Sequence, residues 1–272
     1  MHTRTCAVLL ALLLLATGCG GATKSGKGAQ GAQGDPGSSS PSSDGGDAPA
    51  ADPGAGVAKV GQCFSMTGRQ SRASVAPPAK VSCQKPHTSV IAYVGYVATP
   101  LTAATPVAQR RAAAKKVCEP AFRQVVGGTL ADRAQSVLTW TFFTPGQTQL
   151  KKGARWVRCD VLARSGSQLV TLPSATPLLG NGVPDSLRIC GDKAGNDVSC
   201  ARPHAYRVTA VFRAPGTTYP GTTTVEARSR CQTLTGVLGG FVQVPSQEGW
   251  DSGDRFVRCL ASTLTPTASP SP

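Results

Sequence analysis

The fold is decided by a stretch that the chain contains twice. Residues 145–159 read PGQTQLKKGARWVRC, and residues 245–259 read PSQEGWDSGDRFVRC. Proline, glutamine, an apolar residue, glycine and an Arg-aromatic-Val-Arg-Cys ending recur at the same spacing, so nine of the fifteen positions match. Upstream of each copy stands a Cys-x-x-Pro-His motif, at 83–87 and at 200–204. Two motifs repeated in the same order indicate an internal duplication and predict two similar domains.

Both repeats are predicted to contain the same order of strands around one helix. A short strand carries the first cysteine, a longer one follows the Pro-His pair, an alanine-rich or polar helix ends at paired glycines, and two strands close the unit. The expected elements are 59–66, 87–97, 108–126, 136–144 and 154–163, then 186–191, 204–213, 224–238, 240–244 and 255–262. We therefore expect an α+β fold of two tandem small disulfide-stapled domains, each an antiparallel sheet with one packed helix (β-β-α-β-β).

Composition sets the expected domain boundaries. The two repeats occupy residues 58–164 and 185–262, and residues 165–184, which contain Gly, Pro, Ser and Leu, are the predicted linker between them. Residues 19–57 are dominated by Gly, Ser, Ala, Pro and Asp and have too little apolar surface to fold, so they are predicted to be a flexible linker. Residues 263–272 are rich in Thr, Ser and Pro and are predicted to be a disordered tail.

The first eighteen residues have the pattern of an export signal. Arg4 precedes an apolar run over residues 7–16, which is too short to span a bilayer. Residues 15–19 read LATGC and resemble a bacterial lipobox, so we expect Cys19 to carry a lipid and to become the mature N-terminus. The alternative is an ordinary cut after Ala16 or Gly18. The lipid would hold the protein on the extracytoplasmic face of the cell membrane without spanning it.

Eight cysteines remain after Cys6 leaves with the signal and Cys19 takes the lipid, four in each repeat. An even number per domain in an exported protein predicts disulfides. Three pairings are possible within each repeat. We favour first with second and third with fourth, which gives Cys63–Cys83, Cys118–Cys159, Cys190–Cys200 and Cys231–Cys259. The alternative is a metal or redox site built on the Cys-x-x-Pro-His motifs, although neither repeat has the close cysteine pair that structural zinc sites use.

A family resemblance rests on several of these residues. The run Val60-Gly-Gln-Cys-Phe, the run Val81-Ser-Cys-Gln-Lys-Pro-His, a cysteine within the helix and a final Gly-x-Arg-x-x-x-Cys resemble the septum-formation-related domain. The resemblance covers residues 60–262 in two copies, and the second copy departs at its start, where residues 187–191 read LRICG. It implies an actinobacterial membrane protein or lipoprotein with a role in cell division. It implies no reaction and no ligand.

The sequence offers few catalytic options. It contains no Gly-x-Ser-x-Gly elbow, His-Glu-x-x-His motif or P-loop, and the Gly-x-Gly-x-x-Gly spacing at 26–31 lies in the predicted flexible linker and not between a strand and a helix, so it is no dinucleotide fingerprint. A Cys–His nucleophile pair needs a free thiol, and the expected disulfides use the cysteines of both repeats. We therefore expect no enzyme, no cofactor and no metal. His87 and His204 follow a proline at the head of a strand, where an imidazole usually holds a turn carbonyl; the alternative is a ligand or pH-sensitive contact.

The repeated Arg-aromatic-Val-Arg-Cys strand is the candidate binding element. Because side chains alternate along a strand, the aromatic residue and the second arginine share a face opposite the cysteine. An aromatic ring beside a guanidinium suits a carboxylate, a phosphate or a sugar ring. The alternative is that the aromatic residue packs under the helix and the arginine covers the sheet edge. The candidate binding residues are Arg155, Trp156, Arg158, Arg255, Phe256 and Arg258, with His87 and His204.

The formal net charge is +14, and it falls to +13 when Arg4 is removed with the signal. Part of it lies on the first predicted helix, at Arg110, Arg111, Lys115, Lys116 and Arg123. Outside the cell no nucleic acid is expected, and the available anions are wall polymers and lipid head groups, which attract basic surfaces in a salt-sensitive way. We expect a non-enzymatic binding module whose partners are the membrane and either an anionic wall polymer or an envelope or division protein. A merely solvated basic helix is the alternative.

Overall fold

The computed structural model describes residues 52–74, 80–221, 224–237, 240–251 and 253–263. All of them belong to one compact unit, which covers residues 49–272. The predicted signal, the lipid site at Cys19, most of the predicted flexible linker and the tail lie outside the described residues. Within the described ranges, each helix is too short or too polar to cross a membrane.

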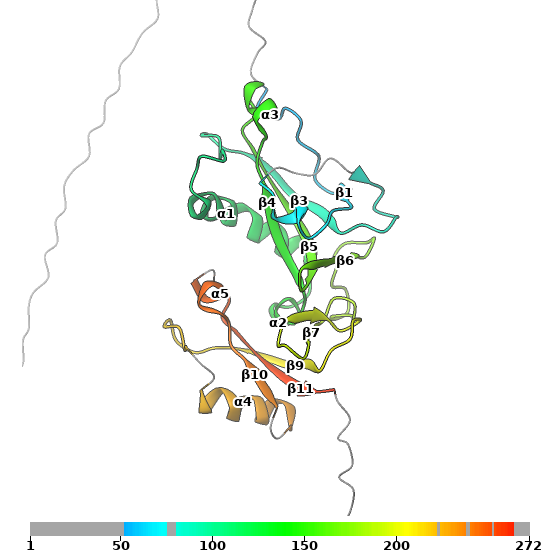
Figure 1. The fold of residues 1–272 in the computed structure, drawn as a ribbon, viewed down its shortest axis with the longest axis vertical. Helices are drawn as coiled ribbons and strands as arrows, with labels where there is room; N and C mark the ends of the chain where they lie inside the picture. The colour runs from blue at the N-terminus through cyan, green and yellow to red at the C-terminus, as the bar shows by residue number, and fades with distance from the viewer. Residues whose placement is uncertain (1–51, 75–79, 222–223, 238–239, 252, 264–272) are drawn as a thin grey trace, which may run out of the picture. The chain divides into compact units, whose positions relative to one another are not determined.

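The first repeat forms an antiparallel sheet with the strand order β2-β1-β3-β5-β4. Its strands are β1 (Cys63–Phe64), β2 (Lys80–Val81), β3 (Ser89–Tyr96), β4 (Leu138–Phe143) and β5 (Trp156–Ser165). Helix α1 (Val107–Val126) packs on one face, where Ala114 and Cys118 join Val157 and Cys159 in a buried cluster. Figure 1 shows α1 beside the strands of this sheet. The opposite face holds a second cluster with Phe64, Phe143 and Trp156.

The second repeat forms a five-stranded antiparallel sheet with the order β10-β11-β9-β7-β8. Its strands are β7 (Ile189–Gly191), β8 (Asp197–Ser199), β9 (Tyr206–Arg213), β10 (Phe241–Gln243) and β11 (Phe256–Ser262). Helix α4 (Val225–Thr235) begins at Thr224, whose hydroxyl accepts a hydrogen bond from the Ala227 amide at 3.1 Å. Its Ala227 and Cys231 pack with Trp250 and Val257.

The expected α+β class with two antiparallel sheets and one long helix on each is confirmed, but the exact β-β-α-β-β order is not. Each repeat has an additional short strand, β2 or β8, beside the second cysteine, because the chain folds back there onto the first strand. Short elements add to the repeats: the 3-10 turn η1 (Gln70–Arg72), the helices α2 (Leu130–Ala134), α3 (Gln147–Lys151) and α5 (Gln247–Asp251), and the strand β6 (Gln168–Val170).

Four disulfides join the cysteines in the pairs that the sequence favours. Cys63–Cys83 and Cys190–Cys200 clip the folded-back strands together. Cys118–Cys159 and Cys231–Cys259 attach α1 to β5 and α4 to β11. Each repeat therefore has one bridge within its sheet and one between helix and sheet.

Residues 165–184, expected to be a linker, are instead folded against the repeats. β6 pairs with β5, and Leu172, Leu178, Leu179 and Val183 are buried. The same apolar cluster includes residues of both repeats, such as Val161 from β5 and Val208 from β9. Packing of these leucines and valines removes apolar surface from water that a linker between separate cores would expose.

Candidate functional site: a hollow beside Arg155

The strand that carries the first repeated motif, β5, is buried on both faces. Trp156 is 1% exposed and lies in the cluster with Phe64 and Phe143. Its indole N–H donates a hydrogen bond to the carbonyl oxygen of Ala55 at 3.2 Å. Ala55 is itself buried, although it falls in the predicted flexible linker. Residues from 52 onward therefore belong to the fold, and they cover the face that was expected to meet a ligand.

Arg158 is also part of this covered face, with an exposed fraction of 2%. Its guanidinium donates to both carboxylate oxygens of Asp160, each at 2.6 Å, and lies 4.0 Å from the centre of the Phe64 ring. Burial raises the pKa of the Asp160 carboxyl, and the hydrogen bonds from Arg158 oppose this rise. The structure thus places Arg158 in a buried ion pair rather than on a binding surface.

The corresponding residues of the second repeat are only partly covered. Arg255 lies over the Trp250 ring, 3.9 Å from its centre, and donates to the Trp250 carbonyl oxygen. Phe256 is half-buried. Arg258 donates through Nε to the carbonyl oxygen of Ala134 at 3.1 Å and lies 3.4 Å from the Asp254 carboxylate. These contacts engage both arginines within the protein.

The two histidines hold turns at the head of their strands. His87 is 2% exposed, and its Nδ1 lies 2.9 Å from the carbonyl oxygen of Lys85. His204 is half-buried and makes the same contact with Arg202 at 2.7 Å. Both imidazoles therefore fit the structural interpretation, in which proline sets the entry and histidine binds the carbonyl two residues before it.

The Cys-x-x-Pro-His motifs do not assemble a metal centre in the described part of the chain. Both of their cysteines are in disulfides, and no group of three or more His, Cys, Asp or Glu side chains there is placed to hold a metal ion. The structure brings each of these histidines to a carbonyl oxygen.

The basic helix α1 is less open than its sequence implies. Arg110 is 7% exposed and donates to the Ser74 hydroxyl at 3.2 Å. Arg123 forms an ion pair with Glu119 at 3.1 Å, one turn earlier. Arg111 and Lys116 are exposed. The cluster of cations expected from the sequence is thus divided between the core, an ion pair and the surface.

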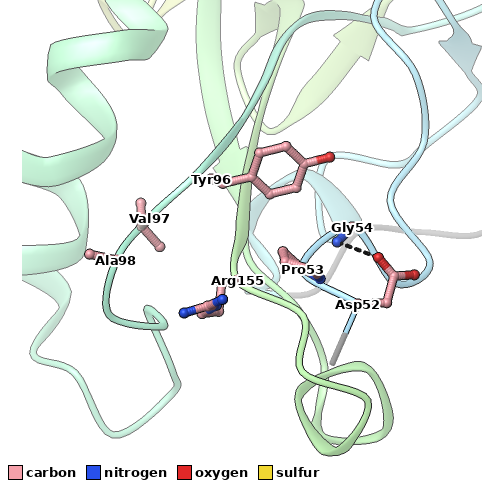
Figure 2. Close-up of a pocket in the computed structure, with 7 residues that line it drawn as sticks. All are labelled: Asp52, Pro53, Gly54, Tyr96, Val97, Ala98 and Arg155. Atoms are coloured by element: carbon pink, nitrogen blue, oxygen red, sulfur yellow. Dashed lines mark hydrogen bonds between the residues drawn. The ribbon is translucent and has the colours of Figure 1, made fainter. Parts of the chain in front are cut away.

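Arg155 is the predicted binding residue that stays open. It is exposed, and its guanidinium makes no hydrogen bond or ion pair with the residues that the structure describes. It lines a hollow of about 480 Å³ together with Asp52, Pro53, Gly54, Tyr96, Val97 and Ala98. Figure 2 shows Arg155 between the segment with Val97 and Ala98 and the turn that contains Pro53.

Backbone hydrogen bonds set the walls of this hollow. The Arg155 amide donates to the Pro53 carbonyl oxygen at 2.9 Å, and its own carbonyl accepts from the Val97 amide at 2.8 Å. The Asp52 carboxylate accepts from the Gly54 amide at 2.9 Å, which closes the turn opposite Arg155 (Figure 2). These bonds hold the three chain segments around a guanidinium that is free to meet a ligand.

Tyr96 supplies the aromatic part of the site in place of Trp156. The two residues are paired across β3 and β5, but Tyr96 is 63% exposed. A Cβ atom on Gly54 would lie only 3.1 Å from the Tyr96 hydroxyl, so the turn and the ring lie close together. The hollow therefore offers a guanidinium and a phenol, both of which bind carboxylate or phosphate oxygens.

The repeats explain why Arg155 is free and Arg255 is not. Trp250 provides the ring on which Arg255 lies, whereas Leu150 holds this position in the first repeat. This difference is visible in the aligned motifs and could have identified Arg155. The contribution of residues 52–54 could not be found in this way, because they fall in a segment whose composition predicts disorder.

A comparison with protein families matches residues 60–240 to the family described as Septum formation. No curated protein matches the chain. No solved structure matches it either.

Proposed function

Because the chain belongs to the septum formation family, we propose that it is a non-enzymatic binding module of the cell envelope that acts in septum formation. Family membership suggests the role in cell division. The four disulfides indicate an extracytoplasmic protein, since such bonds persist in oxidising compartments. The observation that supports the binding role is the exposed guanidinium of Arg155 in its hollow, which has no hydrogen bond or ion pair with the described residues.

The proposed ligand carries a carboxylate or phosphate group. A guanidinium binds such groups through two parallel hydrogen bonds. The Arg155 guanidinium has no other partner among the described residues. The neighbouring Lys151 and Lys152 are exposed and add positive charge at this end of the sheet. An anionic wall polymer or an acidic surface of an envelope protein has this chemistry.

The proposed attachment is a lipid on Cys19. The sequence LATGC at 15–19 supports it, and two acyl chains bind a membrane stably. Intact mass spectrometry of the protein extracted in detergent tests this part. A diacylglyceryl increment on a chain that begins at Cys19 is expected, and an unmodified chain that begins at another residue would contradict it.

Binding is tested by sedimentation of the full mature protein with isolated cell wall at several salt concentrations. Arg155→Met should weaken binding about tenfold or more, since a charged hydrogen bond contributes about 1.5–3 kcal/mol. Arg213→Met is the matched control. Arg213 is an exposed arginine on β9, so this variant loses the same charge at a place outside the Arg155 hollow. Equal loss in both variants would show that net charge, and not the Arg155 hollow, binds the wall.

If the wall does not bind, cross-linking in dividing cells distinguishes the protein partner. Capture of one envelope protein by the wild type, and loss of this product in Arg155→Met, would identify that partner. Cross-linking that is unchanged in Arg155→Met would contradict the proposed site.

A further inference from the structure

A second hollow, of about 640 Å³, is lined by residues of both repeats. Its walls come from the start of β4, the end of β5, β7, the turn between β7 and β8, β10 and β11. A volume of this size lies in the range of small-molecule sites. The polar residues that line it include Ser136, Thr139, Arg164, Asp197, Gln243 and Arg258.

Hydrogen bonds between the repeats hold this hollow together. The Gly166 amide donates to the Asp197 carbonyl oxygen at 2.9 Å, and the Ser199 amide donates to the Ser165 hydroxyl at 3.0 Å. Arg258 reaches the Ala134 carbonyl oxygen at 3.1 Å. Neither repeat alone contains the full set of lining residues, so the site depends on the pair.

Arg164 is a donor without an acceptor in this hollow. Its guanidinium makes no hydrogen bond and no ion pair with the described residues, although it is half-buried. Burial lowers its pKa, and the nearby charge of Arg72 adds to this effect. Arginine remains protonated in proteins, so the side chain presents a partly desolvated positive charge to whatever enters.

Gln243 is an acceptor without a donor in the same hollow. Its Oε1 is buried and unbonded, while its Nε2 donates to the Asp197 carboxylate at 2.9 Å. That bond fixes which end of the amide faces Asp197 and leaves Oε1 to accept from another group. A buried acceptor without a partner is unfavourable, so a donor supplied by a ligand would be favoured.

Arg164, Gln243 and Asp197 together favour a ligand that carries both a negative and a positive charge. Arg164 suits a carboxylate, whereas Gln243 Oε1 and the Asp197 carboxylate suit an ammonium group. Arg258 also lines the hollow but is engaged by Asp254 and the Ala134 carbonyl. Arg164 and Asp197 are therefore the charges left to a ligand, and a ligand with both charges matches them better than a polyanion does. We propose that this hollow is a second binding site, for a zwitterionic ligand of the amino-acid or short-peptide class that presents both an ammonium and a carboxylate.

The test compares three dipeptides of nearly equal size on the full mature protein by isothermal titration calorimetry. Alanyl-alanine carries both charges, N-acetyl-alanyl-alanine lacks the ammonium, and alanyl-alanine amide lacks the carboxylate. We expect the zwitterion to bind about tenfold or more tightly than either analogue. Equal binding of all three, or no binding of the zwitterion, would overturn the proposal.

Variants locate the binding in this hollow. Arg164→Met should weaken alanyl-alanine about ten- to a hundredfold and leave the binding of alanyl-alanine amide unchanged. Gln243→Leu should weaken alanyl-alanine and leave N-acetyl-alanyl-alanine unchanged. The Arg164 guanidinium makes no hydrogen bond or ion pair with a described residue, so its replacement should also leave the thermal unfolding temperature near that of the wild type.

Arg155→Met is the control that separates the two sites. This change should leave dipeptide binding unaffected, because Arg155 lines the other hollow. Loss of dipeptide binding in Arg155→Met with retention in Arg164→Met would overturn the proposal. Failure of wall binding at Arg155 would contradict the proposed function and would not affect the dipeptide result.

Discussion

Arg158 and Asp160 stand two positions apart on β5, on the same face, and form a two-pronged ion pair that is almost fully buried. The Ser89 hydroxyl adds a hydrogen bond to Asp160 at 3.2 Å. In the second repeat, Leu260 stands where Asp160 stands in the first. Arg258 therefore has no acid at that position and reaches Ala134 and Asp254 instead. The same motif thus makes a core ion pair in one repeat and a contact between the repeats in the other.

Breaking this buried pair should destabilise the protein strongly. Asp160→Asn leaves the Arg158 charge buried without its partner, so the free energy of unfolding should fall by about 3–5 kcal/mol. Urea unfolding at neutral pH measures this loss. The double variant Arg158→Met with Asp160→Leu should unfold near the wild-type midpoint, because no charge then remains to be desolvated. A double variant as unstable as the single one would contradict this explanation.

The two histidines should differ in their effect on stability. His87→Ala removes a buried imidazole bonded to Lys85 and should lower the free energy of unfolding by about 1–3 kcal/mol. His204→Ala acts at a half-buried position and should cost less. Thermal unfolding of both variants compares the two. Wall binding should persist in folded His204→Ala, and its complete loss would point to a direct role for that histidine.

Each disulfide should contribute more to the free energy of unfolding the longer the loop that it closes. Cys118–Cys159 spans a sequence separation of 41 residues and Cys190–Cys200 one of 10. In the loop-entropy model, the disulfide that closes the longer loop raises the free energy of unfolding by about 1 kcal/mol more than the other. The paired alanine variants, unfolded in urea, should show this order. Equal loss in both would indicate that native contacts around the sulfurs, and not loop closure, set their contribution.

An exposed ion pair should give stability a dependence on acid pH. Two hydrogen bonds from Arg207 lower the pKa of Asp185 from its usual 3.8. A lowered pKa stabilises the fold above the unfolded value, and this contribution is lost as pH falls below 3.8 through the folded value. The difference in unfolding free energy between wild type and Asp185→Asn should therefore shrink in that range. Arg207→Met should remove most of the same dependence, because Arg207 is the largest cause of the lowered pKa and Arg188 and His204 contribute less.

The sequence predicts much of the architecture because its signals are local. The duplicated motif marks equivalent positions, the alternation of residues marks β3 and β9, and the glycine pair at 127–128 marks the end of α1. The end of α4 was predicted wrongly, because the helix stops at Thr235 with Gly236 as its cap and does not reach the pair at 239–240. The order of the cysteines allows three pairings in each repeat, and the one that the sequence favours is the one found. The additional strands β2 and β8 were not predicted, since two or three residues are too few to show a period.

The candidate site was predicted only in part. Arg155 was named, but it was placed on the core face of its strand, whereas Trp156 and Arg158 were expected to face a ligand. The structure buries both faces of β5, because Ala55, Phe64 and their neighbours cover the second face of the sheet, and leaves Arg155 exposed just before the strand begins. Nothing in the alternation of β5 reveals that cover.

By itself, then, the sequence determined the duplication and the α+β class and favoured the cysteine pairs that the structure has, since each depends on residues near one another or on a repeated order. The tertiary structure decided which arginines are free. Whether a guanidinium is buried with an acid, stacked on a ring or open to a hollow depends on segments distant in the chain, as Arg158, Arg255 and Arg155 show. The physical reason is that exposure and charge pairing belong to the packed surface, and packing joins residues that no local pattern connects.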